Sequence, residues 1–414
     1  MSASGPFGDG NPFEGMPFLG DLAKLLMSSG PVNRDLARQL AVWIAAEGQP
    51  EANVDPLDRM RLEELARVAE MHVGTSTGLD TTSGGLLTVL PVTRSEWATR
   101  TLDAYAPLLE ALATSLATPP GGGAGTGDAG DLSGAGVGER DDPDDAGLDD
   151  PAERLLGRLG GVLAPALMGM QAGSMVGHLA GRAFGQYGFP VPRPASDQLL
   201  VVPANIDAFA ADWSLPIDDL RMWVLLEEIV HHAVLLRPHV RARLDELLRS
   251  YAAGFRPDPS GMEALLSGVD PTDPASLEHA LADPEAVLGT MLSDVQHQVR
   301  RQLAGLVSAL EGYVDHVMDT TGRRLVEAHR SLSEALRRRR VERSEGDRFV
   351  ERLFGLELGQ DQYDRGTAFV RGVVDRAGED GLRRLWLSTV ELPTPAEVDA
   401  PGLWLERIDL PGEP

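Results

Sequence analysis

Residues 222–236 read Met-Trp-Val-Leu-Leu-Glu-Glu-Ile-Val-His-His-Ala-Val-Leu-Leu. Eleven of these fifteen residues are apolar, and the four polar ones, Glu227, Glu228, His231 and His232, lie together in the middle. A helix that is apolar on nearly every face is a buried helix, and buried charges are normally paired, neutralised or bound to a metal. Glu227 and His231 are four residues apart, as are Glu228 and His232, so the members of each pair share a helix face. The stretch predicts a buried helix that carries a functional site.

The middle of this helix follows the metal-binding pattern of zincin metalloproteases at all but one position. In the pattern H-E-x-x-H the two histidines bind zinc and the glutamate polarises the attacking water. Glu227-Glu228-Ile-Val-His231 has glutamate where the pattern has its first histidine. A third ligand must come from elsewhere, and in gluzincins it is the glutamate of an E-x-x-x-D helix. Glu311-Gly-Tyr-Val-Asp315 has that spacing inside a helix predicted over residues 287–320.

Several blocks, spread over most of the chain, resemble the zincin-like hydrolases of high-GC bacteria, which are usually described as zinc-dependent metalloproteases of uncharacterised substrate. The blocks are residues 30–33, 92–97, 185–187, 222–241, 310–319, 355–358 and 363–369. The resemblance implies a mainly α, zincin-like metallopeptidase fold with at most a small β element.

The resemblance also implies roles for individual side chains. His231 would be a metal ligand, Glu228 the general base and Glu311 the third ligand of a zinc ion that activates water against a peptide or protein substrate. Glu227 would either substitute as a ligand or mark a pseudoenzyme. Three further residues would lie just behind the ligands, with the first two as alternative ligands: Asp315, His316 and His232.

Glutamate at position 227 changes the chemistry that such a site could perform. A carboxylate in place of a neutral imidazole lowers the net charge of a zinc site that also contains Glu311 from about +1 to about 0. A less positive metal lowers the pKa of its bound water less, so hydroxide forms less readily near neutral pH. Carboxylate-rich sets also favour Mn²⁺ or Fe²⁺ over zinc. We therefore expect weakened or lost peptidase activity, or a changed metal.

Three other interpretations of this helix stay open. The two i,i+4 pairs could be buried hydrogen-bonded pairs that only hold helices together. The protein could keep a zincin fold and serve as a binding or scaffold module. Glu228-Ile-Val-His231 also has the Glu-x-x-His spacing of helix bundles that hold two metals, with Asp294-Val-Gln-His297 as a poorer second copy.

Composition narrows the class of protein. The chain has 414 residues, no cysteine and a formal net charge of −26. Without cysteine there is no disulfide, thiolate zinc site or cysteine nucleophile, which fits a reducing compartment. The acidic charge argues against a nucleic-acid partner, because phosphate binding needs a basic surface. The first residues lack the basic and apolar regions of a secretory signal, so we expect a cytoplasmic protein.

Five segments differ in composition. We expect a disordered arm at residues 1–18, a helical part at 19–117, a Gly- and Asp-rich flexible insert at 118–152, a zincin-like helical core at 153–392 and an irregular tail at 393–414. Helices are predicted at 57–74, 93–117, 287–320, 323–343 and 362–376, with Pro107 as a break and Asp218 as the N-cap of the buried helix. Residues 198–203 give the best strand candidate.

Glycine recurs at every fourth position over much of residues 157–185. Such a smooth helix face allows another backbone to approach closely, as at GxxxG crossings. Gln171, Ser174, His178 and Arg182 lie within the span and Pro165 lies near its start. We therefore favour tight helix packing over a membrane span.

The run of four arginines at 337–340 could suggest nucleic-acid binding. Glutamates at 327, 334, 342 and 345 surround it at helical spacings. We therefore interpret it as a solvated, salt-bridged helix face.

Overall fold

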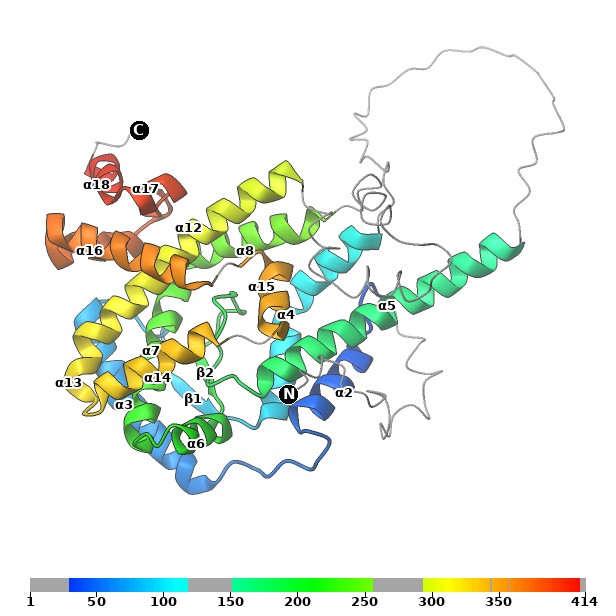
Figure 1. The fold of residues 1–414 in the computed structure, drawn as a ribbon, viewed down its shortest axis with the longest axis horizontal. Coiled ribbons are helices and arrows are strands. Elements are labelled where there is room, and N and C mark those ends of the chain that lie inside the picture. Colours follow the sequence, from blue (N-terminus) through cyan, green and yellow to red (C-terminus); the bar gives the residue numbers. More distant parts are fainter. Residues whose placement is uncertain (1–29, 118–150, 256–292, 343–344, 357, 410–414) are drawn as a thin grey trace, which may run out of the picture.

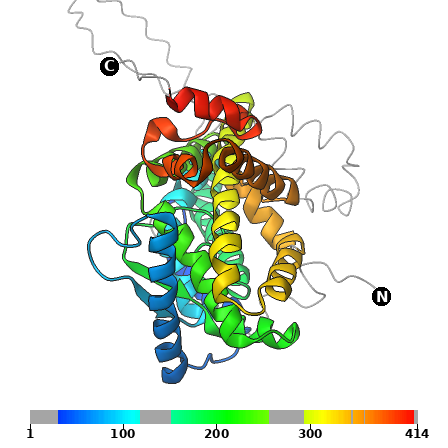
Figure 2. The same ribbon diagram turned by 90° about the vertical axis from the view of Figure 1, so that its left-hand side faces the viewer.

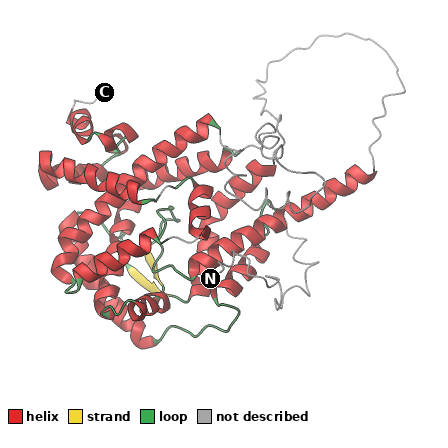
Figure 3. Cartoon of the chain, viewed as in Figure 1, coloured by secondary structure: helices red, strands yellow, loops and turns green. Residues whose placement is uncertain are grey.

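A computed structural model describes residues 30–117, 151–255, 293–342, 345–356 and 358–409. In this part of the chain, helices surround one small sheet of two strands (Figure 3). The mainly α class predicted from the sequence is confirmed. No helix among the described residues combines the length and apolarity needed to cross a membrane.

The N-terminal half contains long helices and both strands (Figure 1). They are α2 (Arg34–Ala45), α3 (Pro56–Thr77), β1 (Thr88–Pro91), α4 (Arg94–Ala117), α5 (Pro151–Ala180), β2 (Gln198–Val201), α6 (Pro203–Asp212), α7 (Ile217–Leu235) and α8 (Pro238–Ala253). Helix α7 is the buried helix predicted from residues 222–236.

The C-terminal half is helical throughout its described residues, and α16, α17 and α18 lie together at one edge of the molecule (Figures 1 and 2). Its elements are α12 (Asp294–Val317), a π-helical turn (Met318–Gly322), α13 (Arg323–Leu325), α14 (His329–Val341), α15 (Glu345–Phe354), α16 (Gln360–Arg383), two 3₁₀ turns (Arg384–Trp386 and Thr389–Glu391), α17 (Pro395–Asp399) and α18 (Pro401–Asp409).

The sheet anchors the segment that faces α7. Strands β1 and β2 are parallel, with Thr88 opposite Gln198, and a parallel pair needs the long crossover that α4 and α5 supply. Strand β2 lies within the strand predicted at 198–203 and ends before Pro203, where α6 begins. Strand β1 was not predicted, because its four residues include a proline. Beside β2, the backbone amide of Val202 donates to the carbonyl of Phe184 at 2.7 Å, and Gly185 bridges to Val201. Residues 184–187 therefore run along β2 towards α7.

The glycine face of α5 packs against α2, as predicted. A Cβ at Gly169 would lie 2.4 Å from the carbonyl oxygen of Asn33, and one at Gly173 would lie 2.5 Å from that of Ala37. Since real Cβ atoms do not approach so closely, only glycine lets these two helices meet at this distance.

Several local predictions need correction. Helix α4 continues through Pro107. Helix α7 begins at Ile217 without a side-chain cap, and Asp218 in its first turn pairs instead with Arg61 at 2.9 Å. The break predicted after residue 320 is a π-helical turn that continues into α13, and the chain leaves the helix only between Leu325 and α14.

The irregular tail predicted from residue 393 is wrong for residues 395–409. Thr394 and Glu397 form a capping box with Pro395 at the first helical position, which starts α17. Trp404 of α18 is fully buried and its indole N–H donates to the carbonyl of Glu391 at 2.6 Å. This anchor holds the tail on the core.

One hydrophobic core includes side chains from both sides of the Gly- and Asp-rich insert, such as Leu62 and Leu112 before it and Leu225 and Phe369 after it. Residues 1–29 and 118–150, which contain the predicted arm and nearly all of the insert, lie outside the described residues.

Candidate functional site

Helix α7 carries four ionisable groups through the core. Glu228, His231 and His232 are at most 6% exposed, and the Glu227 side chain is 22% exposed. Every other residue from Leu220 to Leu235 is buried. The two i,i+4 side-chain pairs do not form, because the four groups bond to residues outside α7: Glu227 to α14, His231 to α12, and Glu228 and His232 to the segment at residues 186–187.

Glu228 is held by backbone amides of the segment that runs beside β2. The amide of Gln186 donates to Glu228 Oε2 at 2.9 Å, and that of Tyr187 donates to the same oxygen at 3.0 Å. A Cβ at Gly185 would lie 2.2 Å from the carboxyl carbon, so only glycine leaves room for this approach. Burial raises the pKa of Glu228 to about 7, although the neighbouring imidazole and the amides oppose that shift.

His231 lies between its own helix and α12. Its Nδ1 is 2.9 Å from the carbonyl oxygen of Glu227, and its Nε2 is 3.3 Å from Oε1 of Glu311, which is buried on α12. Burial alone lowers the pKa of this imidazole, but Glu311, Glu227 and Glu228 together raise it to about 9. Both ring nitrogens of the protonated form donate to oxygen here.

Glu227 points to an arginine of α14. Arg340 donates to Glu227 Oε1 through Nη2 and to Asp315 Oδ1 through Nη1, each at 2.8 Å, and its guanidinium lies 4.8 Å from the centre of the Tyr363 ring. The indole N–H of Trp223 donates to the other Glu227 oxygen at 3.2 Å. Burial favours the neutral carboxyl, but Arg340, His231 and Arg339 together outweigh it and hold the pKa of Glu227 below its usual value. The acid is therefore a carboxylate in a salt bridge.

The structure brings together Glu227, Glu228, His231 and Glu311, which all line one cavity of about 150 Å³. The three residues predicted to lie behind the ligands each contact a further side chain. Asp315 contacts Arg340; His316 Nε2 is 3.0 Å from Glu379; and His232 Nδ1 is 2.8 Å from the Tyr187 hydroxyl. Asp294 and His297, the second copy of the two-metal pattern, are exposed at the start of α12 and far from a buried site.

Arg340 is the main residue that the sequence analysis missed. The arginine run was interpreted as a solvated face, and this holds for Arg337 and Arg338, which pair with Glu334 at the surface. Arg339 and Arg340 point inward instead. A signal was present, because the buried residues Leu332, Ala335 and Leu336 place residues 339 and 340 on the same helix face.

These side chains do not form a ready set of zinc ligands. In the described part of the chain, no three His, Asp or Glu side chains are grouped so that they could hold a metal ion. The carboxylate of Glu227 is occupied by Arg340 and Trp223, and the imidazole of His231 by Glu311. Structural and catalytic zinc sites need at least three protein donors around one point. The donor set as folded does not fit that requirement.

Comparison with known proteins identifies the family. No curated protein matches the chain. A crystal structure reported as that of a candidate hydrolase with a novel fold, from Chloroflexus aurantiacus, is similar with a TM-score of 0.62 and 22% identity, over 92% of this chain and 100% of that one. A family profile described as zincin-like metallopeptidase matches residues 32–405. The chain belongs to the zincin-like metallopeptidase family.

Proposed function

We propose that this chain keeps the cleft of a zincin-like metallopeptidase but binds a peptide there without cleaving it. The family implies a hydrolase-like protein that uses zinc in general, and the similar structure is reported as a candidate hydrolase. The observation that carries the proposal is the position of Arg340, whose guanidinium contacts both Glu227 and Asp315 at 2.8 Å.

Arg340 supplies an internal cation where a metallopeptidase would need a metal. A guanidinium stays protonated in proteins, so the positive charge beside Glu227 is permanent. This charge compensates two carboxylates that a bound dication would otherwise compensate, and it repels such a dication. His231 compensates Glu311 in the same way when it is protonated. Each potential ligand therefore has a partner within the protein.

The cavity at this site has the composition of a binding pocket. Charged groups from α7, α12 and α14 meet aromatic and aliphatic side chains from the segment beside β2 and from the C-terminal half. Pockets that combine apolar walls with a few fixed polar groups bind ligands specifically. The apolar part of the wall includes Phe184, Phe189, Leu358 and Tyr363. We infer a peptide ligand because the family consists of metallopeptidases.

Metal analysis tests the proposal directly. Untagged protein, purified without metal-affinity resin and dialysed against Zn²⁺, Mn²⁺ or Fe²⁺, should contain no stoichiometric metal. The double variant Glu227→His with Arg340→Gln should bind zinc, since it restores the histidine and removes the competing cation. His231→Ala in that background should lose the zinc again. One equivalent of metal in the unaltered protein that disappears in His231→Ala would overturn the proposal.

A peptide assay separates binding from hydrolysis. A mixture of synthetic peptides should be retained by the immobilised protein, survive treatment with a chelator and be recovered intact. Cleavage that stops both with chelator and with Glu228→Gln would instead establish an active metalloprotease. The raised pKa of Glu228 makes this outcome a specific alternative, because a carboxyl group with a pKa of about 7 can exchange protons near neutral pH. No retention of any peptide would refute the binding function.

A further inference from the structure

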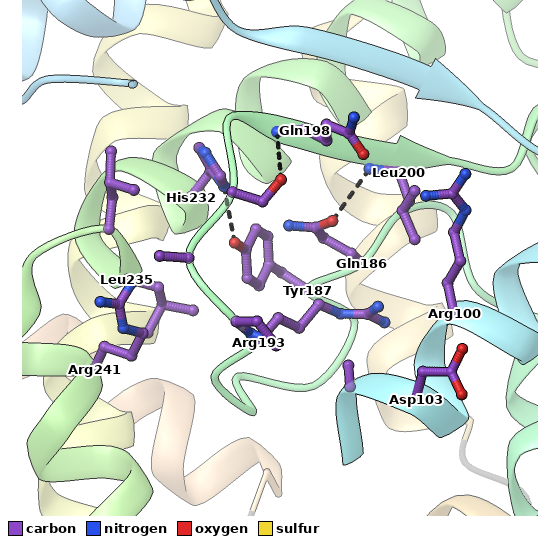
Figure 4. Close-up of a pocket in the computed structure, with 15 residues that line it drawn as sticks. Arg100, Asp103, Gln186, Tyr187, Arg193, Gln198, Leu200, His232, Leu235 and Arg241 are labelled. Atoms are coloured by element: carbon purple, nitrogen blue, oxygen red, sulfur yellow. Dashed lines mark hydrogen bonds between the residues drawn. The ribbon is translucent and has the colours of Figure 1, made fainter. Parts of the chain in front are cut away.

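A second pocket lies on the far side of Tyr187 from the site just described. It has a volume of about 290 Å³ and shares Gln186 and Tyr187 with the first cavity. Helices α4, α7 and α8, strand β2 and the loop before β2 form its walls (Figure 4). Its charged residues are Arg100, Asp103, Arg193 and Arg241.

The pocket carries an excess of positive charge on a strongly acidic protein. The single acid, Asp103, is already paired with Arg38 at 2.8 Å, and Arg100 pairs with Glu96 at 2.9 Å. No carboxylate in the described part of the chain forms an ion pair with Arg193 or Arg241. The whole chain has a formal charge of −26, so two guanidinium groups without a carboxylate partner in one pocket are unusual. They indicate that the pocket binds an anion.

Arg193 is held rigidly for such a partner. Its Nη2 donates to the hydroxyl of Thr101 at 2.7 Å, and its guanidinium lies 5.7 Å from the Trp97 ring and 5.5 Å from the Tyr105 ring. Its buried Nε has no hydrogen-bond partner among the described residues. An arginine fixed on aromatic rings loses little conformational entropy on binding, which favours recognition of a planar or tetrahedral oxyanion.

His232 adds to the wall a ring nitrogen, Nε2, that has no hydrogen-bond partner among the described residues. The side chain is 3% exposed, and burial lowers its pKa to about 4, so the imidazole is neutral. Burial also raises the pKa of Tyr187, which keeps its hydroxyl protonated and able to donate to His232 Nδ1 at 2.8 Å (Figure 4). In the tautomer that accepts this hydrogen bond the ring proton lies on Nε2, and Nε2 has no hydrogen-bond partner in the described part of the chain.

We propose that this pocket binds a small organic oxyanion, a carboxylate or a phosphate, held by Arg193 and Arg241. Guanidinium groups form charge-assisted hydrogen bonds with both kinds of oxyanion, often through two parallel N–H donors. The pocket volume is at the lower end of small-molecule sites, so the ligand is compact. This pocket adjoins the cavity around Glu228 and His231 and shares Gln186 and Tyr187 with it, but its arginines Arg193 and Arg241 do not line that cavity, so the proposal stands independently of the peptide-binding function.

Titration calorimetry on the full-length protein tests the site with defined probes. Succinate and inorganic phosphate represent the two oxyanions, and succinamide is the neutral analogue of succinate. At least one anion should bind and succinamide should not. Arg241→Gln and Arg193→Gln should each weaken that binding at least about tenfold, the loss of one charge-assisted contact. Arg249→Gln is the matched control, since Arg249 is an exposed residue of the same helix that pairs with Asp245.

Each outcome of the titration either supports or refutes the proposed site. Binding of succinate alone or of phosphate alone identifies the ligand chemistry and supports the site. The proposal fails if neither anion binds up to about 10 mM, if succinamide binds as well as succinate, or if both arginine variants bind like the unaltered protein. Near-ultraviolet circular dichroism shows which variants are folded. If Arg193→Gln is not, Arg241→Gln decides the question, because Arg241 makes no ion pair among the described residues that its removal could break.

Discussion

Replacing Arg340 with glutamine should strongly destabilise the protein. The guanidinium makes two ion-pair contacts of 2.8 Å, and the side chains of Arg340, Glu227 and Asp315 are 25%, 22% and 30% exposed. Removing one partner from a fully buried pair costs about 3–5 kcal/mol, and from an exposed pair about 0–1 kcal/mol. With roughly three quarters of each side chain buried, and with two carboxylates left near Glu311, we expect a loss of about 3 kcal/mol in the free energy of unfolding.

Urea denaturation measures this loss. The transition is followed by far-ultraviolet circular dichroism and by tryptophan fluorescence, and coincident curves justify a two-state treatment. The midpoint should fall by about 1 M for a slope near 3 kcal/mol/M. The control is Arg338→Gln in the same helix, which removes a pair with Glu334 whose arginine side chain is 59% exposed and should cost less than about 0.5 kcal/mol.

A double-mutant cycle isolates the contact itself. Glu227→Gln combined with Arg340→Gln should lose less stability than the sum of the two single variants, with a coupling energy of about 1–3 kcal/mol. A loss below about 1 kcal/mol for Arg340→Gln, or a coupling energy near zero, would refute the argument that Arg340 compensates Glu227.

Three further changes test other contacts, each by thermal unfolding in a calorimeter. Gly312→Ala would place its Cβ 2.2 Å from the backbone of Gly366, where α12 crosses α16, and should cost about 2–4 kcal/mol by overpacking. Its control, Gly74→Ala, meets open space in α3 and should add up to about 1 kcal/mol of stability. Gly185→Ala would force its Cβ against the Glu228 carboxyl group and should cost about 2 kcal/mol. If the proposed loss of the metal is correct, a chelator should leave the melting temperature of the unaltered protein within about 1 °C, because no bound metal would then contribute to stability; a larger drop would contradict the proposal.

Local sequence was enough for the elements whose pattern repeats at short range. The apolar run around Glu228 and His231 identified α7 as a buried helix because its periodicity needs no knowledge of the rest of the fold. The glycine face of α5 identified a close helix crossing for the same reason. A helix face without side chains allows a close backbone approach whichever helix packs against it. The strand predicted at 198–203, of which 198–201 form β2, was recognisable from its β-branched, apolar composition.

The site was only partly predictable. The sequence brought Glu228, His231 and Glu311 into one hypothesis, and all three line the same cavity. The spacing of apolar residues in α14 could have placed Arg340 on a buried face, but nothing in the sequence indicated that its partner is Glu227, 113 residues earlier. Nor did it indicate that the amides of residues 186 and 187 bind Glu228. The hydrogen bonds of Glu227, Glu228 and His231 join α7 to three distant segments (residues 186–187, α12 and α14), and their pairing depends on how these segments cross.

The amino-acid sequence by itself determined which helix is buried and which ionisable groups it takes into the core. The tertiary structure decided what compensates those groups. Periodicity and residue type involve residues only a few positions apart, so they can be recognised in the sequence alone. The choice of Arg340 as the partner of Glu227, of two backbone amides for Glu228 and of Glu311 for His231 arises from contacts between distant segments. A buried charge is stable only beside such a partner, and the packing of α7, α12 and α14 supplies it.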